Sequence, residues 1–177
     1  MKLLILDRDG VINHDSDHYI KSPDEWRPVP GSMEAIALLT QSGWRIAVAT
    51  NQSGISRGLF SAETLNAIHA KMHKAVTLSG GRIEAVFYCP DSAESNSPCR
   101  KPNPGMLHAI AERFNTPLAA VPMVGDSLRD LQAASTAGAK PFLVLSGKGR
   151  KTRKQGGLPE GTRIFRDLAA VARELLH

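Results

Sequence analysis

Leu3-Leu4-Ile5-Leu6-Asp7-Arg8-Asp9-Gly10 is the stretch of sequence from which the fold can be predicted. Its four consecutive apolar residues predict a strand buried on both faces, as strands are in parallel sheets. Ligands of open α/β sheets bind beyond the carboxyl ends of the strands, so we expect Asp7 and Asp9 at a binding site. Two carboxylates this close repel each other, which favours a shared proton or a bound cation, and hard oxygen ligands suit Mg²⁺. An ordinary strand-to-turn exit would also place Asp and Gly here.

Apolar strand patterns alternate with helical patterns along the rest of the chain. We expect further strands at residues 45–49, 83–88, 122–125 and 141–145, and helices at residues 31–42, 61–78, 104–114, 128–137 and 167–176. This alternation predicts an α/β fold, a Rossmann-like parallel sheet with helices on both faces. The length of 177 residues favours one domain spanning residues 1–177.

The composition is that of a globular protein, with 42% apolar and 22% charged residues. The apolar runs are too short to span a membrane, and the first strand begins too early to leave room for a signal peptide. We therefore expect a cytoplasmic protein. Two cysteines, Cys89 and Cys99, do not make a disulfide framework. No unexplained apolar stripe stands out, so we expect a monomer.

The net charge of +5 is concentrated in one place rather than spread over a face. Five cations lie in a basic Gly-rich loop predicted at residues 147–161: Lys148, Arg150, Lys151, Arg153 and Lys154. Such a loop is either a solvated surface segment or an attractor of an anionic substrate. A nucleic-acid binder is a further alternative, although aromatic residues are not interleaved with the cations. Steep salt dependence of DNA binding would support that alternative.

Polar residues also follow the other predicted strands. Thr50-Asn51-Gln52-Ser53-Gly54 follows the second strand and offers a hydroxyl, an amide and free backbone N–H groups for a phosphate. Arg100 and Lys101 would supply a planar fork and a point charge near such a group. Asp126 follows the strand at 122–125. We expect these strand ends to meet at one edge of the sheet.

Two other features leave alternatives open. The segment 11–30 leaves the carboxyl end of the first strand, and it either covers the site or is a plain surface loop. His69 and His73 are four residues apart and share a helix face. Because no third ligand is near them in the sequence, we expect surface histidines rather than a metal-binding pair.

In order along the chain, these motifs resemble those of the haloacid dehalogenase superfamily of phosphohydrolases. They read Leu-Asp-Arg-Asp-Gly (6–10), Ala-Thr-Asn-Gln (49–52), Arg-Lys-Pro (100–102) and Gly-Asp-Ser-Leu-Arg-Asp (125–130). More narrowly, Asn-Gln-Ser-Gly-Ile-Ser-Arg-Gly and Cys-Arg-Lys-Pro-Asn-Pro-Gly-Met resemble the histidinol-phosphatase-like branch, which has no large cap domain. The resemblance implies a phosphatase that removes the 7-phosphate of D-glycero-D-manno-heptose 1,7-bisphosphate, a precursor of lipopolysaccharide heptose. Histidinol phosphate is the alternative substrate. A polynucleotide 3′-phosphatase and a protein that binds without catalysis are lower alternatives.

The resemblance also implies roles for individual residues. Asp7 would be the nucleophile, and Asp9 the general acid and then the base, with a neighbouring carboxylate raising the pKa of Asp9. Mg²⁺ would bind the Asp7 side chain, the Asp9 carbonyl and Asp126. Thr50 and Asn51 would hold phosphoryl oxygens, and Lys101 would stabilise the charge that they gain.

The substrate would meet a larger set of side chains that surround the strand ends. The candidates are Asp15, Ser16, Asp17, His18, Tyr19, Asn51, Gln52, Ser53, Arg57, Arg100 and Ser127. A bisphosphate needs a second anion site, and Arg100 is the first choice for it. Asp130 is equally suited to stabilising a helix and to binding a metal.

The similar branch often carries a structural zinc loop before its Arg-Lys-Pro motif. The matching positions here are Cys89, Asp91, Ser97 and Cys99, so only two thiols remain. Structural zinc normally takes four Cys or His ligands. We therefore expect the loop to hold no structural zinc.

Overall fold

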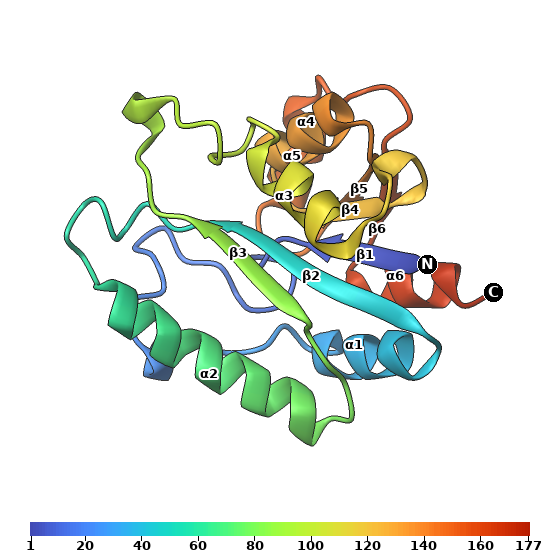
Figure 1. Ribbon diagram of the computed structural model, residues 1–177, viewed down its shortest axis with the longest axis horizontal. Helices are drawn as coiled ribbons and strands as arrows, with labels where there is room; N and C mark the ends of the chain where they lie inside the picture. The colour runs from blue at the N-terminus through green and yellow to red at the C-terminus, as the bar shows by residue number, and fades with distance from the viewer.

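One sheet of six parallel strands organises the chain, in the order β3-β2-β1-β4-β5-β6 (Figure 1). The computed structural model describes residues 1–177. The strands are β1 (Lys2–Leu6), β2 (Trp44–Asn51), β3 (Ala85–Cys89), β4 (Pro122–Gly125), β5 (Lys140–Val144) and β6 (Arg163–Phe165). The predicted Rossmann-like parallel sheet is confirmed.

Strand β1 lies at the centre of the sheet, between β2 and β4. Successive side chains of a strand point to opposite faces. Leu4 and Leu6 therefore pack into the core on one face, and Leu3 and Ile5 into the core on the other. The strand order changes direction here, because β2 and β3 extend to one side of β1 and β4, β5 and β6 to the other. Such a switch point is where sheets of this kind bind ligands.

Helices cover both faces of the sheet (Figure 1). On one face lie α1 (Ser32–Gln41), α2 (Ala62–Leu78) and α6 (Leu168–Leu175). On the other lie α3 (Gly105–Phe114) and α4 (Leu128–Ala137). Helix α2 begins as predicted, because the Ser61 side chain accepts a hydrogen bond from the Thr64 N–H. Helix α3 begins one residue later than the predicted start at residue 104, because Pro104 takes the N-cap position.

The region after β5 differs from the sequence prediction. Residues 149–155 form a short helix, α5 (Gly149–Gln155), within the segment 147–161 that we predicted as a loop. Its sequence has no apolar stripe, so periodicity did not reveal it. The strand at 141–145 was predicted to be the last, but β6 follows it and pairs with β5. Only three residues long, β6 is held by the packing of Phe165 on Phe142, whose ring centroids lie 5.0 Å apart.

No helix of the protein is both long enough and apolar enough to cross a bilayer.

Candidate active site

The carboxyl ends of β1 and β4 bring two acids together from distant parts of the sequence. Asp7 follows β1 and Asp126 follows β4, and the Asp7 N–H donates to the Val124 carbonyl at 2.9 Å. Between them lies a cavity of about 50 Å³ that has no apolar lining residue. Its lining residues are Asp7, Asp9, Asp15, Asn51, Lys101, Asp126, Ser127, Arg129 and Lys148. The strand ends that we expected at one edge therefore do meet there.

Lys101 is buried at the floor of this site, with 1% of its side chain exposed. Its Nζ lies 3.0 Å from Asp7 Oδ1 and 2.7 Å from Asp130 Oδ1, and it donates to the Ala49 carbonyl at 2.8 Å. The side chain of Asn51 holds the same segment, since its Oδ1 accepts from the Lys101 N–H and its Nδ2 donates to the Lys101 carbonyl. Lys101 thus enters the site with a fixed position and two carboxylate partners.

Asp130 takes the first of the two roles that the sequence left open, which is to stabilise a helix. Its Oδ2 accepts from the N–H and the hydroxyl of Ser127, which forms a capping box at the start of α4. Its Oδ1 pairs with Lys101. Asp130 is therefore a helix-stabilising residue that also neutralises the buried lysine.

The turn before α5 holds Asp126 from the side. The Lys148 N–H donates to Asp126 Oδ2 at 2.8 Å, and the Thr152 hydroxyl donates to the Asp126 carbonyl at 2.7 Å. Gly147 packs against the same carboxylate in a left-handed conformation, with φ of 56°. A Cβ at this position would lie 2.3 Å from Asp126 Oδ2 and 2.5 Å from the Gly10 Cα. The segment that we predicted as a basic loop thus fixes an acid of the site.

We expect Gly147→Ala to weaken Mg²⁺ binding and to lower the free energy of unfolding by about 2 kcal/mol, since both a left-handed alanine and a clash oppose it. The matched control is Gly157→Ala, at a left-handed glycine with open space around it. That control should lose stability but keep the metal affinity. Mg²⁺ titration of both variants, followed by thermal unfolding, measures the difference, and equal affinities would contradict the prediction.

Asp9 is surrounded by hydrogen-bond donors. Its Oδ1 accepts from Arg8 Nε at 3.0 Å, from Arg8 Nη2 at 2.8 Å and from Asn13 Nδ2 at 2.9 Å. Burial raises the pKa of Asp9, but the charge of Arg8 and the hydrogen bonds of Asn13, Arg8 and Gln52 outweigh it, so the pKa is lowered. The expectation that a neighbouring carboxylate raises the pKa of Asp9 is therefore wrong for the substrate-free protein.

The raised pKa values belong to the two acids at the strand ends. Burial, followed by the charge of Asp130, raises the pKa of Asp7 well above its usual range. Burial and Asp130 also raise the pKa of Asp126 to about 7. Both carboxylates are thus short of positive charge, although Lys101 lies close to them.

These residues fit a divalent cation with oxygen ligands. The protein donates no hydrogen bond to Asp7 Oδ2, to Asp126 Oδ1 or to the Asp9 carbonyl oxygen, so all three remain available. Carboxylate oxygens of Asp7 and Asp126 lie within 4.8 Å of each other. Hard oxygen donors with unbalanced negative charge suit Mg²⁺. Asp130 belongs to the same acidic cluster, but Lys101 and Ser127 engage its oxygens.

A second cavity, of about 230 Å³, adjoins the first at Asp9. Most of the predicted substrate residues line it: Asp15, Ser16, Asp17, Tyr19, Asn51, Gln52, Ser53, Arg57 and Arg100. Part of the segment 11–30 therefore does cover the site. Their contacts with a substrate stay predictions, as do the catalytic roles.

Three predicted residues lie differently from the rest. His18 lines neither cavity and faces an adjacent one of about 350 Å³. Thr50 is buried and lines neither cavity, and its hydroxyl accepts from Gln52 Nε2. Ser127 lines the small cavity, but its hydroxyl donates to Asp130.

Sequence reasoning missed Arg129 and treated Lys148 only as part of a basic loop. Both residues line both cavities. Lys148 Nζ lies 3.4 Å from Asp15 Oδ2 and 3.9 Å from Asp17 Oδ1. Arg129 stands in the first turn of α4, inside the Gly-Asp-Ser-Leu-Arg-Asp motif (125–130), and that position was the available signal.

His69 corrects another prediction. We expected surface histidines at 69 and 73, but His69 is buried, and its Nε2 lies 3.1 Å from Arg8 Nη1. Burial, followed by the charge of Arg8, lowers the pKa of His69 to about 3. The fold thus favours the neutral imidazole.

This shift predicts a loss of stability in acid. The unfolded chain takes up a proton at His69 near pH 6.5, whereas the folded protein resists until about pH 3. Stability is therefore fully present above pH 6.5 and falls below it, by about 2 kcal/mol from this residue at pH 5. Urea unfolding of the metal-free protein and of His69→Gln at pH 7 and pH 5 tests this. The wild type should lose about 2 kcal/mol more than the variant, and equal losses would refute the prediction.

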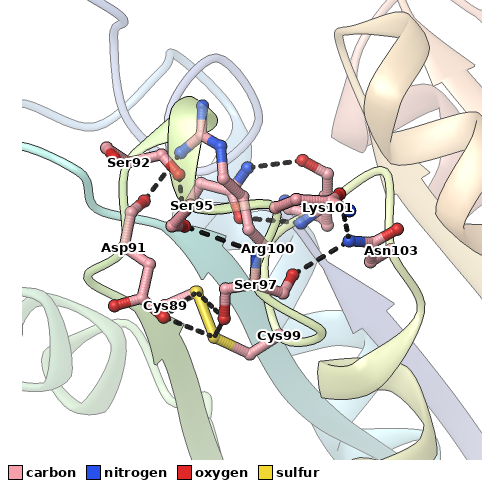
Figure 2. Close-up of a disulfide and its surroundings, with 11 residues drawn as sticks. Cys89, Asp91, Ser92, Ser95, Ser97, Cys99, Arg100, Lys101 and Asn103 are labelled. Carbon is pink, nitrogen blue, oxygen red and sulfur yellow. Dashed lines mark hydrogen bonds between the residues drawn. A yellow bond between two sulfur atoms is a disulfide. The ribbon is translucent and has the colours of Figure 1, made fainter.

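The two cysteines are joined in a disulfide, although we did not expect two cysteines to make a disulfide framework (Figure 2). Cys89 ends β3 and Cys99 precedes Arg100, so the bond ties the sheet to the segment that carries Arg100 and Lys101. Arg100 Nη1 donates to the Asp91 carbonyl across the same loop. Asp91 lies close to both sulfurs, but metals bind thiolates, and the disulfide offers none. The absence of zinc stays a prediction.

Comparison with known proteins adds a second line of evidence. A family model described as HAD-hydrolase-like matches residues 98–171. The D-glycero-β-D-manno-heptose-1,7-bisphosphate 7-phosphatase of Bordetella bronchiseptica is 61% identical over 99% of this chain and 98% of its own length. The enzyme of the same name from Pseudomonas putida is 56% identical over 99% of this chain and its full length.

Solved structures agree with these relatives. The crystal structure of the B. bronchiseptica D,D-heptose 1,7-bisphosphate phosphatase, complexed with magnesium and phosphate, superposes with a TM-score of 0.98, covering 99% of this chain and 98% of that one. The Burkholderia thailandensis enzyme, 54% identical, superposes with a TM-score of 0.80 and covers 99% of both chains. With this identity over nearly the whole length, and with the strand-end acids and buried lysine in place, the chain belongs to the D-glycero-β-D-manno-heptose-1,7-bisphosphate 7-phosphatase family of HAD-like hydrolases.

Proposed function

We propose that the protein is an Mg²⁺-dependent phosphatase that removes the 7-phosphate of D-glycero-D-manno-heptose 1,7-bisphosphate through an aspartyl-phosphate. One observation carries the chemistry: the Asp7 carboxylate opens on a polar cavity, with Lys101 on one of its oxygens and Asp126 close by. The names of the relatives support the substrate.

In the first step, an Asp7 carboxylate oxygen attacks phosphorus, and the bond from phosphorus to the sugar oxygen breaks. The departing oxygen takes a proton from Asp9. Asp9 has a lowered pKa in the free protein. The negative charge of the arriving phosphate raises that pKa, which favours the proton that the step requires.

In the second step, a water oxygen attacks phosphorus and the bond to Asp7 breaks. Asp9, now ionised, takes the proton of the water, so that free phosphate leaves and the starting state returns. Lys101 places positive charge beside Asp7, where the transferring oxygens gain negative charge.

Asp7, the Asp9 carbonyl and Asp126 would hold Mg²⁺. The ion would supply positive charge that lets an anionic carboxylate approach an anionic phosphate. The unengaged oxygens of these three residues and the raised pKa values of Asp7 and Asp126 support this cofactor.

A second phosphate on the substrate is supported by three arginines. Arg57, Arg100 and Arg129 line the 230 Å³ cavity, and none of them forms an ion pair. Such unpaired guanidinium groups suit an anion some distance from the reacting phosphate. Histidinol phosphate carries a cationic amine at its other end, and these arginines would repel it.

The decisive experiment compares phosphate release from heptose 1,7-bisphosphate and from histidinol phosphate, each with Mg²⁺ and with chelator. We expect strong preference for the heptose bisphosphate and no release with chelator. Preference for histidinol phosphate would replace the substrate and keep the mechanism, whereas release from neither would refute the proposal. We propose that the enzyme works in the cytoplasm, because a charged sugar bisphosphate does not cross membranes unaided and such precursors are made there. We also propose that it is a monomer, since the sequence shows no unexplained apolar stripe.

A further inference from the structure

Arg8 stands between the two acids of β1's carboxyl end and is fully buried. Arginine is almost never fully buried unless it is paired. Two of its nitrogens, Nε and Nη2, donate to the same oxygen of Asp9 at 3.0 and 2.8 Å. The third nitrogen, Nη1, is left without a carboxylate partner.

His69 supplies the missing acceptor from another part of the fold. It lies on α2, and its Nε2 is 3.1 Å from Arg8 Nη1. A guanidinium only donates hydrogen bonds, so Nε2 must accept and the ring must carry its proton on Nδ1. The strongly lowered pKa of His69 agrees with a neutral ring.

The two carboxylate oxygens of Asp9 accept different numbers of hydrogen bonds. Asp9 Oδ1 accepts three hydrogen bonds, two from Arg8 and one from Asn13. Asp9 Oδ2 receives only Gln52 Nε2, at a longer 3.3 Å. Asp9 lines both cavities, so Oδ2 is the oxygen left to exchange a proton there.

We propose that His69 is a positioning residue for the reaction: it holds the Arg8 guanidinium in the plane that engages Asp9 Oδ1 and leaves Oδ2 for proton transfer. His69 touches neither cavity and acts only through Arg8. The kinetic part of this inference rests on the proposed function, because it concerns the acid and base role of Asp9.

Kinetics of three substitutions at His69 test the proposal with heptose 1,7-bisphosphate. His69→Leu removes the acceptor and His69→Asn is too short to reach Arg8, whereas His69→Gln can place an oxygen near the position of Nε2. We expect kcat to fall about tenfold or more in the first two, with KM within twofold, because a misplaced acid slows chemistry more than binding. His69→Gln should stay within about threefold of wild type. His73→Gln, on the same helix and half-buried, should match wild type.

All assays are run well below each variant's measured unfolding temperature. A folded His69→Asn or His69→Leu protein with kcat within twofold of wild type would overturn the proposal. Equal losses in the Gln and Leu variants would also overturn it, because a packing role predicts no rescue by a hydrogen-bond acceptor.

A second measurement is independent of the substrate. Hydrogen exchange of the Arg8 Nε proton, followed by NMR, should be slow in wild type and His69→Gln. It should be about tenfold faster in His69→Asn, where the guanidinium is released. If wild type released no phosphate, the proposed function would fail, and this exchange experiment would still judge the role of His69. Unchanged exchange in His69→Asn would overturn it.

Discussion

Asp7→Asn should abolish turnover of the heptose bisphosphate, with kcat reduced by a factor of about 10⁴ or more. The amide keeps the shape of the side chain, but it cannot form the phosphoryl bond. Asp7 combines a contact with the buried Lys101 at 3.0 Å with a second oxygen that accepts no hydrogen bond from the protein. Phosphate release under single-turnover conditions, with Mg²⁺ in excess, measures the effect.

Loss of the fold would not explain such a result. Burial and the charge of Asp130 raise the pKa of Asp7, so a neutral amide relieves repulsion among the buried acids. Lys101 keeps its partner Asp130 in this variant. We therefore expect the unfolding midpoint of Asp7→Asn to equal or exceed that of wild type. Turnover within tenfold of wild type would show that another group attacks phosphorus.

Lys101→Met should cost both stability and activity. The substitution leaves Asp7 and Asp130 buried without their shared counter-charge. Breaking a buried ion pair by removing one partner typically costs about 3–5 kcal/mol, a large part of the stability of a domain. We expect the free energy of unfolding in urea to fall by about that amount, and kcat to fall by a factor of about 10³.

A double variant separates the two effects. Lys101→Met combined with Asp130→Asn removes one orphaned charge and keeps an oxygen for the cap of α4. It should recover part of the lost stability, while kcat stays as low as in the single variant. Recovery of kcat with stability would mean that Lys101 is structural only, and an unchanged unfolding midpoint in Lys101→Met would contradict the ion-pair argument.

Patterns of apolar and polar residues that are close in the sequence were sufficient to predict the fold class. Leu3–Leu6 identified the central strand because a run of apolar side chains is stable only where both faces are covered. The same patterns located the carboxyl ends of four strands, and hence the meeting of Asp7, Asp126 and Lys101. Features without such a pattern were missed, as the polar helix α5 and the three-residue strand β6 illustrate.

The positions of the side chains that surround the acids could not be predicted from such local patterns. We expected His69 on the surface because no third metal ligand is near it in the sequence. It is instead buried beside Arg8, 61 positions away in the sequence. The strand pattern also gave no hint that Cys89 and Cys99 meet, since a disulfide depends on where a loop returns. Contacts of this kind depend on how helices and loops pack against the sheet.

The pKa values of the buried acids show most clearly what the sequence determines and what only the folded structure decides. Adjacent acids implied that one pKa would be raised, and the general-acid role that the resemblance implies for Asp9 assigned the raised pKa to that residue. The folded protein instead turns Arg8 onto Asp9 and crowds Asp7 with Asp126 and Asp130, so that the raised pKa falls on Asp7. Residue types and their spacing along the strands follow from local sequence and identify the kind of chemistry. Which acid is protonated depends on distances of a few ångströms between groups far apart in the chain, and those distances exist only after folding.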